Sequence, residues 1–205
     1  MSGLFFAFTA LAQQPGVPGR FDYYVLSLSW SPTWCATEGG RRDGEQCGGA
    51  RHYGFVVHGL WPQYAGGGYP AECGVPAPLP PKLVEDMLPL MPSRKLIEHE
   101  WKRHGSCGGL PPTEYFAETR RARAKVQVPA ALAAPERTLT LSVEEIERQF
   151  IAANPGLTAD AVSVVCRRRE VAEVRICLGR DLGFRPCARD VRDRCGPSAV
   201  LPALR

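Results

Sequence analysis

Hydrophobic residues gather in short continuous runs near the two ends of the chain. Residues 21–30 (FDYYVLSLSW) and 53–62 (YGFVVHGLWP) are rich in aromatic and β-branched side chains, as are residues 161–166 (AVSVVC) and 170–178 (EVAEVRICL). Runs of this kind, bounded by Gly, Pro or charged residues, are typical of buried strands. The pattern therefore predicts two strands toward each end of the chain.

Between these runs the apolar residues take the spacing of amphipathic helices. Three helical segments are expected in succession, at residues 82–90, 93–104 and 112–128. Ser93 is the expected N-cap of the second. Ser142 begins a further helix, because Glu145 three positions later completes a capping box and Pro155 ends the segment.

Two stretches predict loops instead of regular elements. The segment between Cys35 and Cys47 is rich in Gly and Arg, and residues 64–81 are rich in Gly and Pro. Strands at both ends with helices between them indicate an α+β fold.

Length and composition place the chain among ordinary globular domains. It has 205 residues, of which 44% are hydrophobic and 22% charged, and it contains no apolar run long enough to span a membrane. The net charge of +4 is compatible with a polyanionic partner, and equally with a solvated basic surface. One domain over residues 21–205 is expected.

The chain contains eight cysteines and no C-x-x-C pair. An even count without that motif favours four disulfides over metal-binding knuckles, and points to an oxidising compartment. Spacing alone leaves all 105 possible connectivities open.

The first residues resemble a secretory signal. Residues 3–12 (GLFFAFTALA) form a short apolar run that ends in an A-x-A pattern, so residues 1–12 are interpreted as a signal segment and residues 13–20 as a linker. No Lys or Arg precedes Arg20, so a truncated signal and a buried N-terminal strand both stay open. A secreted or periplasmic location is expected.

The segment HEWKRHGSC, residues 99–107, lies one residue away from the zinc-protease pattern H-E-x-x-H. Here the second histidine comes five positions after the first. At about 100° per helical residue, His99 and His104 stand roughly 140° apart, so they are badly placed to share one metal ion. Glu100, Arg103 and His104 fall on one helix face instead.

His58 is the second histidine of interest, at the end of an apolar strand. Either segment alone has an ordinary structural interpretation, a surface salt-bridge cluster for one and a structural histidine for the other. Together His58 and His104 suit a reaction in which one imidazole accepts a proton and the other donates one. Cleavage of RNA is such a reaction, since its 2′-OH supplies the nucleophile. Arg103 would offset the developing charge and Trp61 would offer a flat surface to a base.

These segments resemble a known family. FVVHGLWPQY (55–64) and IEHEWKRHGSC (97–107) look like the two active-site segments of the ribonuclease T2 family, secreted endoribonucleases that are often most active in acid. FDYYVLSLSWSPTWC and RICLGRDLGFRPC are similar to the opening strand and the late Cys-bounded hairpin of that family, so the resemblance covers residues 21–196. It implies an antiparallel central sheet flanked by helices and stabilised by disulfides. It also implies cleavage of single-stranded RNA without a metal or other cofactor. A monomer is expected, because an exposed groove for a polymer suits one.

The resemblance implies a role for each matching residue. His104 would be the general base and His58 the general acid, and the two would exchange roles when the 2′,3′-cyclic product is hydrolysed to a 3′-phosphate. Glu100 and Arg103 would stabilise the phosphorane, and His99 would help to hold phosphate. The family most often has Lys at the position of Arg103, and the planar guanidinium spreads the same charge differently.

The base-binding residues follow from the same comparison. Trp61 and Tyr69 would line the first base site. Gln63 stands where some members carry an acidic residue that reads a base edge, so the base preference of those members does not carry over. The resemblance also implies four disulfide pairings, namely Cys35–Cys47, Cys73–Cys107, Cys166–Cys195 and Cys177–Cys187.

Three other functions are consistent with part of the sequence. A metal-dependent hydrolase could use His58, His99, His104 and Glu100, and would lose activity with a chelator. A secreted module could bind RNA or protein without cleavage, although such a protein would be expected to lack part of the catalytic pair. A disulfide-rich inhibitor or adhesion domain explains the cysteines but not the HGLWP segment.

Overall fold

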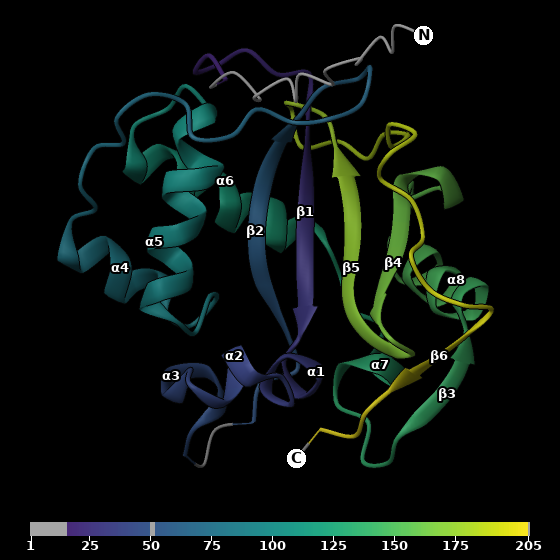
Figure 1. Cartoon of the computed structure of the whole chain (residues 1–205). Coiled ribbons are helices and arrows are strands. Elements are labelled where there is room, and N and C mark those ends of the chain that lie inside the picture. Colours follow the sequence, from purple (N-terminus) through teal and green to yellow (C-terminus); the bar gives the residue numbers. More distant parts are fainter. Residues whose placement is uncertain (1–15, 50–51, 205) are drawn as a thin grey trace, which may run out of the picture.

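Six strands form one sheet at the centre of the computed structural model, which describes residues 16–49 and 52–204 (Figure 1). The strand order is β2-β1-β5-β6-β3, and β4 pairs with the free edge of β5. The strands are β1 Tyr23–Trp30, β2 Phe55–Gln63, β3 Leu139–Ser142, β4 Val162–Arg167, β5 Glu170–Leu178 and β6 Ser198–Leu201. The predicted signal segment lies outside the described residues.

All four predicted strands are present, and the pairs among them are antiparallel. Two short strands, β3 and β6, were not predicted. They pair with each other, and β6 meets β5 in parallel at Val200 and Glu170. The expectation of an antiparallel central sheet therefore holds for the central strands.

The predicted helices are also present, with boundaries set by capping and by proline. They are α4 Pro81–Met87, α5 Arg94–Arg103, α6 Pro112–Lys125 and α8 Val143–Ala153. Ser93 and Ser142 are the N-caps of α5 and α8, as predicted. The first helix ends before the predicted residue 90, because Pro89 has no N–H to continue the hydrogen-bond pattern. The third ends at Lys125, because Val126 takes an extended conformation.

The prediction of a loop between Cys35 and Cys47 was partly wrong. This segment contains two short helices, α2 Glu38–Arg41 and α3 Gly44–Cys47, and follows a third, α1 Ser31–Cys35. The side chains of Thr37 and Asp43 accept hydrogen bonds from the helix ends that follow them. Such capping offsets the poor helix propensity of the glycines. The remaining short helices are η1 Gly105–Cys107, α7 Ala130–Ala133 and η2 Ala159–Ala161.

The sheet separates a large core from a smaller apolar cluster. Leu26, Leu28 and Ile176 point into the large core together with Phe116 of α6 and Phe150 of α8. The opposite face carries the smaller cluster, which consists of Tyr23, Val25, Cys177 and Ala188, with Trp61 packed against it. Figure 1 shows α4, α5 and α6 on the β2 side of the sheet, α8 beyond β4, and α1 to α3 at the end of β1.

Four disulfides join the eight cysteines in the pairing that the family resemblance implied. The bond between Cys73 and Cys107 ties the loop after β2 to the turn that follows α5. Residues 16–20, the described part of the predicted linker, run along the body of the protein, where Gly19 donates a 2.9 Å hydrogen bond to the carbonyl of Cys107. No helix in the described part of the chain is both long and apolar enough to cross a membrane.

Candidate active site

An irregularity in β2 places the His58 side chain. Gly59 pairs with Ser27 and Val57 pairs with the next residue, Leu28, so His58 is the extra residue of a β-bulge. A bulge re-aims the side chain of the strand at that point. The imidazole thus comes to face the side chain of Glu173 on β5, on the sheet face opposite the large core, and is about a third exposed.

The end of α5 supplies the second group of predicted residues. Glu100 is buried within the last turn, and His104 is the C-cap residue with only 6% of its surface exposed. Arg103 is partly exposed and His99 is exposed. The helix therefore turns Glu100 and His104 inward and leaves Arg103 and His99 at the rim.

A hydrogen bond joins the two predicted segments. The indole Nε1 of Trp61 donates to Oε2 of Glu100 at 2.6 Å, and Oε1 of the same carboxylate lies 3.5 Å from Nε2 of His58. Gly59 makes this approach possible, because a Cβ there would stand 2.1 Å from Oε2 of Glu100. The salt-bridge cluster of Glu100 with Arg103 and His104, considered from the sequence, is not formed in the described residues, since the carboxylate turns toward β2.

The environment of His58 favours the protonated imidazole. Burial lowers the pKa of His58, but the 3.0 Å hydrogen bond to Glu173 and the negative charges of Glu100 and Glu173 outweigh it, so the pKa lies above its usual 6.5. Burial also raises the pKa of the Glu100 carboxyl, against the opposing effects of His58 and Trp61.

The environment of His104 has the opposite effect. Its ring lies between Trp61 and Tyr69, with ring centroids 5.3 and 5.5 Å away. Burial, together with the charges of Arg103, His58 and His99, lowers the pKa of His104 to about 3. The two histidines therefore differ in protonation over a wide pH range, with His104 neutral and His58 charged.

Arg103 lies at the rim of the site. Its guanidinium donates to the hydroxyl of Tyr69 at 3.2 Å and lies 3.8 Å from the carboxylate of Glu72. Its charge acts on His104 and Glu100 without a direct hydrogen bond to either. Burial and the charges of Arg103 and His58 lower the pKa of His99, so this exposed imidazole shares the electrostatic field of the site.

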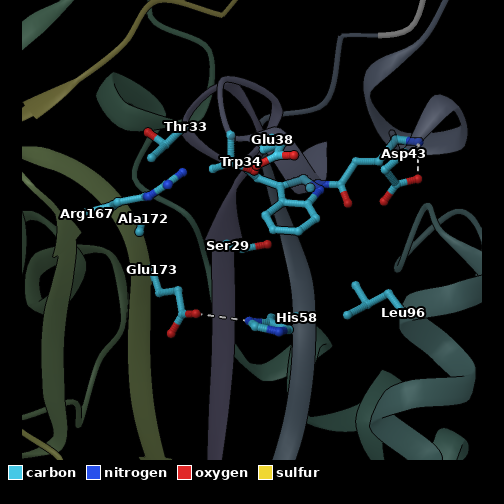
Figure 2. Close-up of a pocket in the computed structure, with 13 residues that line it drawn as sticks. Ser29, Thr33, Trp34, Glu38, Asp43, His58, Leu96, Arg167, Ala172 and Glu173 are labelled. Atoms are coloured by element: carbon cyan, nitrogen blue, oxygen red, sulfur yellow. Dashed lines mark hydrogen bonds and ion pairs between the residues drawn. The ribbon is translucent and has the colours of Figure 1, made fainter. Parts of the chain in front are cut away.

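Two cavities open on either side of the histidine pair. One, of about 230 Å³, contains all three predicted base-binding residues; its lining includes Trp61, Gln63, Tyr69, His104 and Arg175. The other, of about 420 Å³, is shown in Figure 2; its lining includes Ser29, Trp34, His58, Leu96 and Glu173. His104 thus borders the first cavity and His58 the second.

Three residues of the site were missed by the sequence analysis: Trp34, Glu173 and Arg175. Trp34 is 40% exposed and overhangs the second cavity (Figure 2). Arg175 lies over the Trp61 ring, 5.1 Å from its centroid, and binds Glu173. A signal was available on β5, because Glu173 and Arg175 alternate with buried apolar residues and so had to share one face of the strand.

The described residues include no group of three or more His, Cys, Asp or Glu side chains placed to hold a metal ion. Of the two histidines in the HEWKRH segment, His99 is exposed and His104 is buried.

Comparisons with known proteins agree on one family. The sequence model described as "Ribonuclease T2 family" matches residues 21–187. A ribonuclease of Aeromonas hydrophila is 36% identical over 201 residues, which are 95% of this chain and 89% of the relative. Ribonuclease 1 of Arabidopsis thaliana is 26% identical over 212 residues, covering 90% of this chain and 87% of the relative.

Solved structures share the fold. An RNase-related protein from Calystegia sepium superposes with a TM-score of 0.74 at 24% identity, over 90% of this chain and 98% of the other. RNase NT, solved in complex with 5′-AMP, gives a TM-score of 0.72 at 22% identity, over 90% and 99% of the two chains.

Proposed function

Because this chain is an endoribonuclease of the ribonuclease T2 family, we propose that it cleaves single-stranded RNA by acid–base catalysis between His104 and His58. The observation that carries the proposal is the placement of the two imidazoles around the Trp61 ring, with centroids 5.2 and 5.3 Å from it, in contrasting environments. These environments lower the pKa of His104 to about 3 and raise that of His58 above 6.5. Groups whose environments push their pKa values apart are suited to act as base and acid.

The neutral imidazole of His104 takes the proton of the 2′-OH, and the 2′-oxygen attacks phosphorus. His58 gives its proton to the departing 5′-oxygen as the P–O bond breaks, which leaves a 2′,3′-cyclic phosphate. In the second step His58 removes a proton from water, His104 protonates the 2′-oxygen, and a 3′-phosphate is released. Neither step requires a metal ion or other cofactor.

Three further side chains act on the phosphorus centre in this proposal. The Arg103 guanidinium and the Glu100 carboxyl stabilise the equatorial oxygens of the phosphorane, and His99 holds phosphate at the rim. Support comes from the burial of Glu100 beside His58, 3.5 Å away, and from the effect of Arg103 on the pKa of His104.

The lining of the two cavities supports one direction for the bound RNA. The nucleotide that carries the attacking 2′-OH must lie beside the general base, His104. Its nucleobase therefore enters the cavity of Trp61, Gln63 and Tyr69, which His104 borders. The leaving nucleoside must lie by the acid, and it enters the cavity that His58 borders. Bases splayed apart in this way are available only in single-stranded RNA.

Location and assembly are part of the same proposal. Four disulfides fit an oxidising compartment, which supports a secreted or periplasmic enzyme. An open groove that must admit a polymer suits a monomer.

The test is incubation of a short RNA with the protein in excess EDTA at about pH 5.5, with products analysed by mass. At this pH His104 is neutral and His58 is protonated. Fragments that end in a 2′,3′-cyclic phosphate or 3′-phosphate are expected, and an all-deoxy oligonucleotide should stay intact. RNA bound but uncut would favour the non-catalytic module. Cleavage restored only by added metal would favour the metal-dependent hydrolase.

A further inference from the structure

A second carboxylate contacts His58, that of Glu173. It comes from β5, which lies outside the two predicted active-site segments. Oε1 of Glu173 lies 3.0 Å from Nδ1 of His58, although 115 positions separate the two residues. Glu173 pairs across the sheet with Ser29 of β1, so β1 is the strand that brings β5 and the bulge of β2 into register. Figure 2 shows the two side chains facing each other at the edge of the second cavity.

A guanidinium holds this carboxylate in place. Nε and Nη2 of Arg175 both contact Oε2 of Glu173 at 2.7 Å, which leaves Oε1 for the imidazole. Burial raises the pKa of Glu173, but the hydrogen bonds and charges of His58 and Arg175 outweigh it and lower the pKa to about 2. The carboxylate is therefore ionised at any pH at which the enzyme is expected to work.

An ionised carboxylate can only accept a hydrogen bond. Nδ1 of His58 must then carry a proton whether the ring is neutral or charged. The proton that the ring gains and loses is thereby confined to Nε2, the nitrogen on the side of Glu100. A fixed tautomer and a fixed ring plane are what a general acid requires.

We propose that Glu173, held by Arg175, is a positioning residue that orients His58 and confines its transferable proton to Nε2. This inference rests on the proposed function, in which His58 is the general acid for the 5′-oxygen. Glu173 touches neither phosphate nor base in this proposal and acts through His58 alone.

The charges around His58 predict the effect of removing the carboxylate. Glu173 and Arg175 of β5 and Glu100 of α5 act on the pKa of this imidazole. Its own charge in turn lowers the pKa values of His99 of α5 and of the C-cap residue His104. With Glu173 replaced by Gln, burial and Arg175 still lower the pKa of His58, and Glu100 alone raises it. The amide can also donate to Nδ1, which would stabilise the wrong tautomer.

The decisive variant is Glu173→Gln, with Glu170→Gln on the same strand as a matched control. The His58 ring, assigned by its loss in His58→Ala, is titrated by NMR in each protein. We expect a lower His58 pKa and a mixed tautomer in Glu173→Gln. We also expect kcat for RNA to fall by about 10- to 100-fold, less than the roughly 100- to 10,000-fold contribution of a general acid itself, because the imidazole is still present. Glu170→Gln should match the parent chain in the His58 pKa, in the His58 tautomer and in kcat.

A double-mutant cycle distinguishes a positioning role of Glu173 from a general effect on the fold. Adding Glu173→Gln to His58→Ala should cause almost no further loss of kcat, because the residue that it orients is already gone. Two results would overturn the inference: losses of kcat that multiply in the double variant, or a His58 pKa and tautomer that are unchanged in Glu173→Gln. Glu173→Asp, which keeps the charge but is one methylene shorter, provides the same readouts if the Gln variant does not fold.

The NMR titration needs no RNA, so it distinguishes the two proposals. A parent chain that fails to cleave RNA would refute the proposed function, while the His58 titration would still report whether Glu173 controls the ring.

Discussion

The Trp61 indole and the Glu100 carboxylate meet in a hydrogen bond of 2.6 Å, and this bond fastens helix α5 to strand β2. Its geometry brings one oxygen of Glu100 to His58 and leaves Trp61 between the two histidine rings, whose centroids lie 5.2 and 5.3 Å from the indole. The acid, the base and the carboxylate therefore share one rigid support, and a change at this junction should affect all three.

Gly59 is the residue that admits this junction. In Gly59→Ala the new methyl group would lie 2.1 Å from Oε2 of Glu100 and 2.3 Å from Nε1 of Trp61, so the hydrogen bond must break. We expect kcat/KM for RNA to fall by about 100-fold, the scale for catalytic groups misplaced by about 1 Å. The free energy of unfolding should fall by about 1–3 kcal/mol, as for overpacked interiors.

Kinetics and thermal unfolding of Gly59→Ala would be compared with Gly66→Ala, where nothing lies within 4 Å of the added carbon. Equal behaviour of the two variants would mean that the junction tolerates a wider separation than the structure indicates.

Much of this site was predictable from local sequence. The strand that carries His58 and the N-cap at Ser93 are predicted by short-range patterns, although His58 lies within β2 and not at its end. The helical phase of Glu100 and His104 follows from their spacing. The implied disulfides were confirmed as well. These features depend on residues close together in the chain or on motifs long enough to be specific.

The remainder of the site depends on strand register. Glu173 reaches His58 only because β5 and β2 flank β1 and because β2 bulges at His58. Neither the pairing nor the bulge has a local signature in the sequence. Trp34 was missed for a related reason, since the short helix α1 (Ser31–Cys35) that carries it was not predicted and no wall of a cavity was expected there.

Removal of either histidine should abolish most of the activity. We expect His58→Ala and His104→Ala each to lower kcat by at least about 100-fold, since each removes one proton-transfer group. His52→Ala is the matched control, because His52 is exposed and borders neither cavity of the site. Single-turnover cleavage of a defined RNA measures the effect, and near-normal turnover in either catalytic variant would contradict the assignment.

The pH dependence should follow from the two histidines. The base works only above its pKa, which for His104 is lowered to about 3, and the acid works only below its pKa, which for His58 is raised above 6.5. The value of kcat/KM should therefore rise through the first pKa, stay high in mild acid, and fall through the second. Rates at constant ionic strength, with circular dichroism to confirm folding at each pH, provide the profile. Activity that keeps rising above neutral pH would contradict it.

The same two pKa values predict accumulation of the cyclic product. Hydrolysis of the 2′,3′-cyclic phosphate requires His58 neutral and His104 protonated, the reverse of the favoured state. Because the pKa of His104 is lowered to about 3 and that of His58 is raised above 6.5, this reverse form is a small minority at every pH. A time course followed by mass should show cyclic ends well before 3′-phosphate ends. Simultaneous appearance of both kinds of end would argue that bound phosphate brings the pKa values of the two histidines together.

Trp34 should bind the leaving nucleoside and nothing else. Its exposed ring overhangs the cavity that His58 borders, and stacking of a base on an aromatic ring contributes about 1–3 kcal/mol. Trp34→Ala should therefore raise KM for a dinucleoside phosphate by about 5- to 150-fold, whereas Trp34→Phe should keep most of the affinity. A nucleoside 2′,3′-cyclic phosphate has no leaving nucleoside, so its hydrolysis by Trp34→Ala should match the parent rate. If both substrates were impaired alike, Trp34 would be acting on the catalytic pair or on the fold, and the assigned direction of the RNA would lose its support.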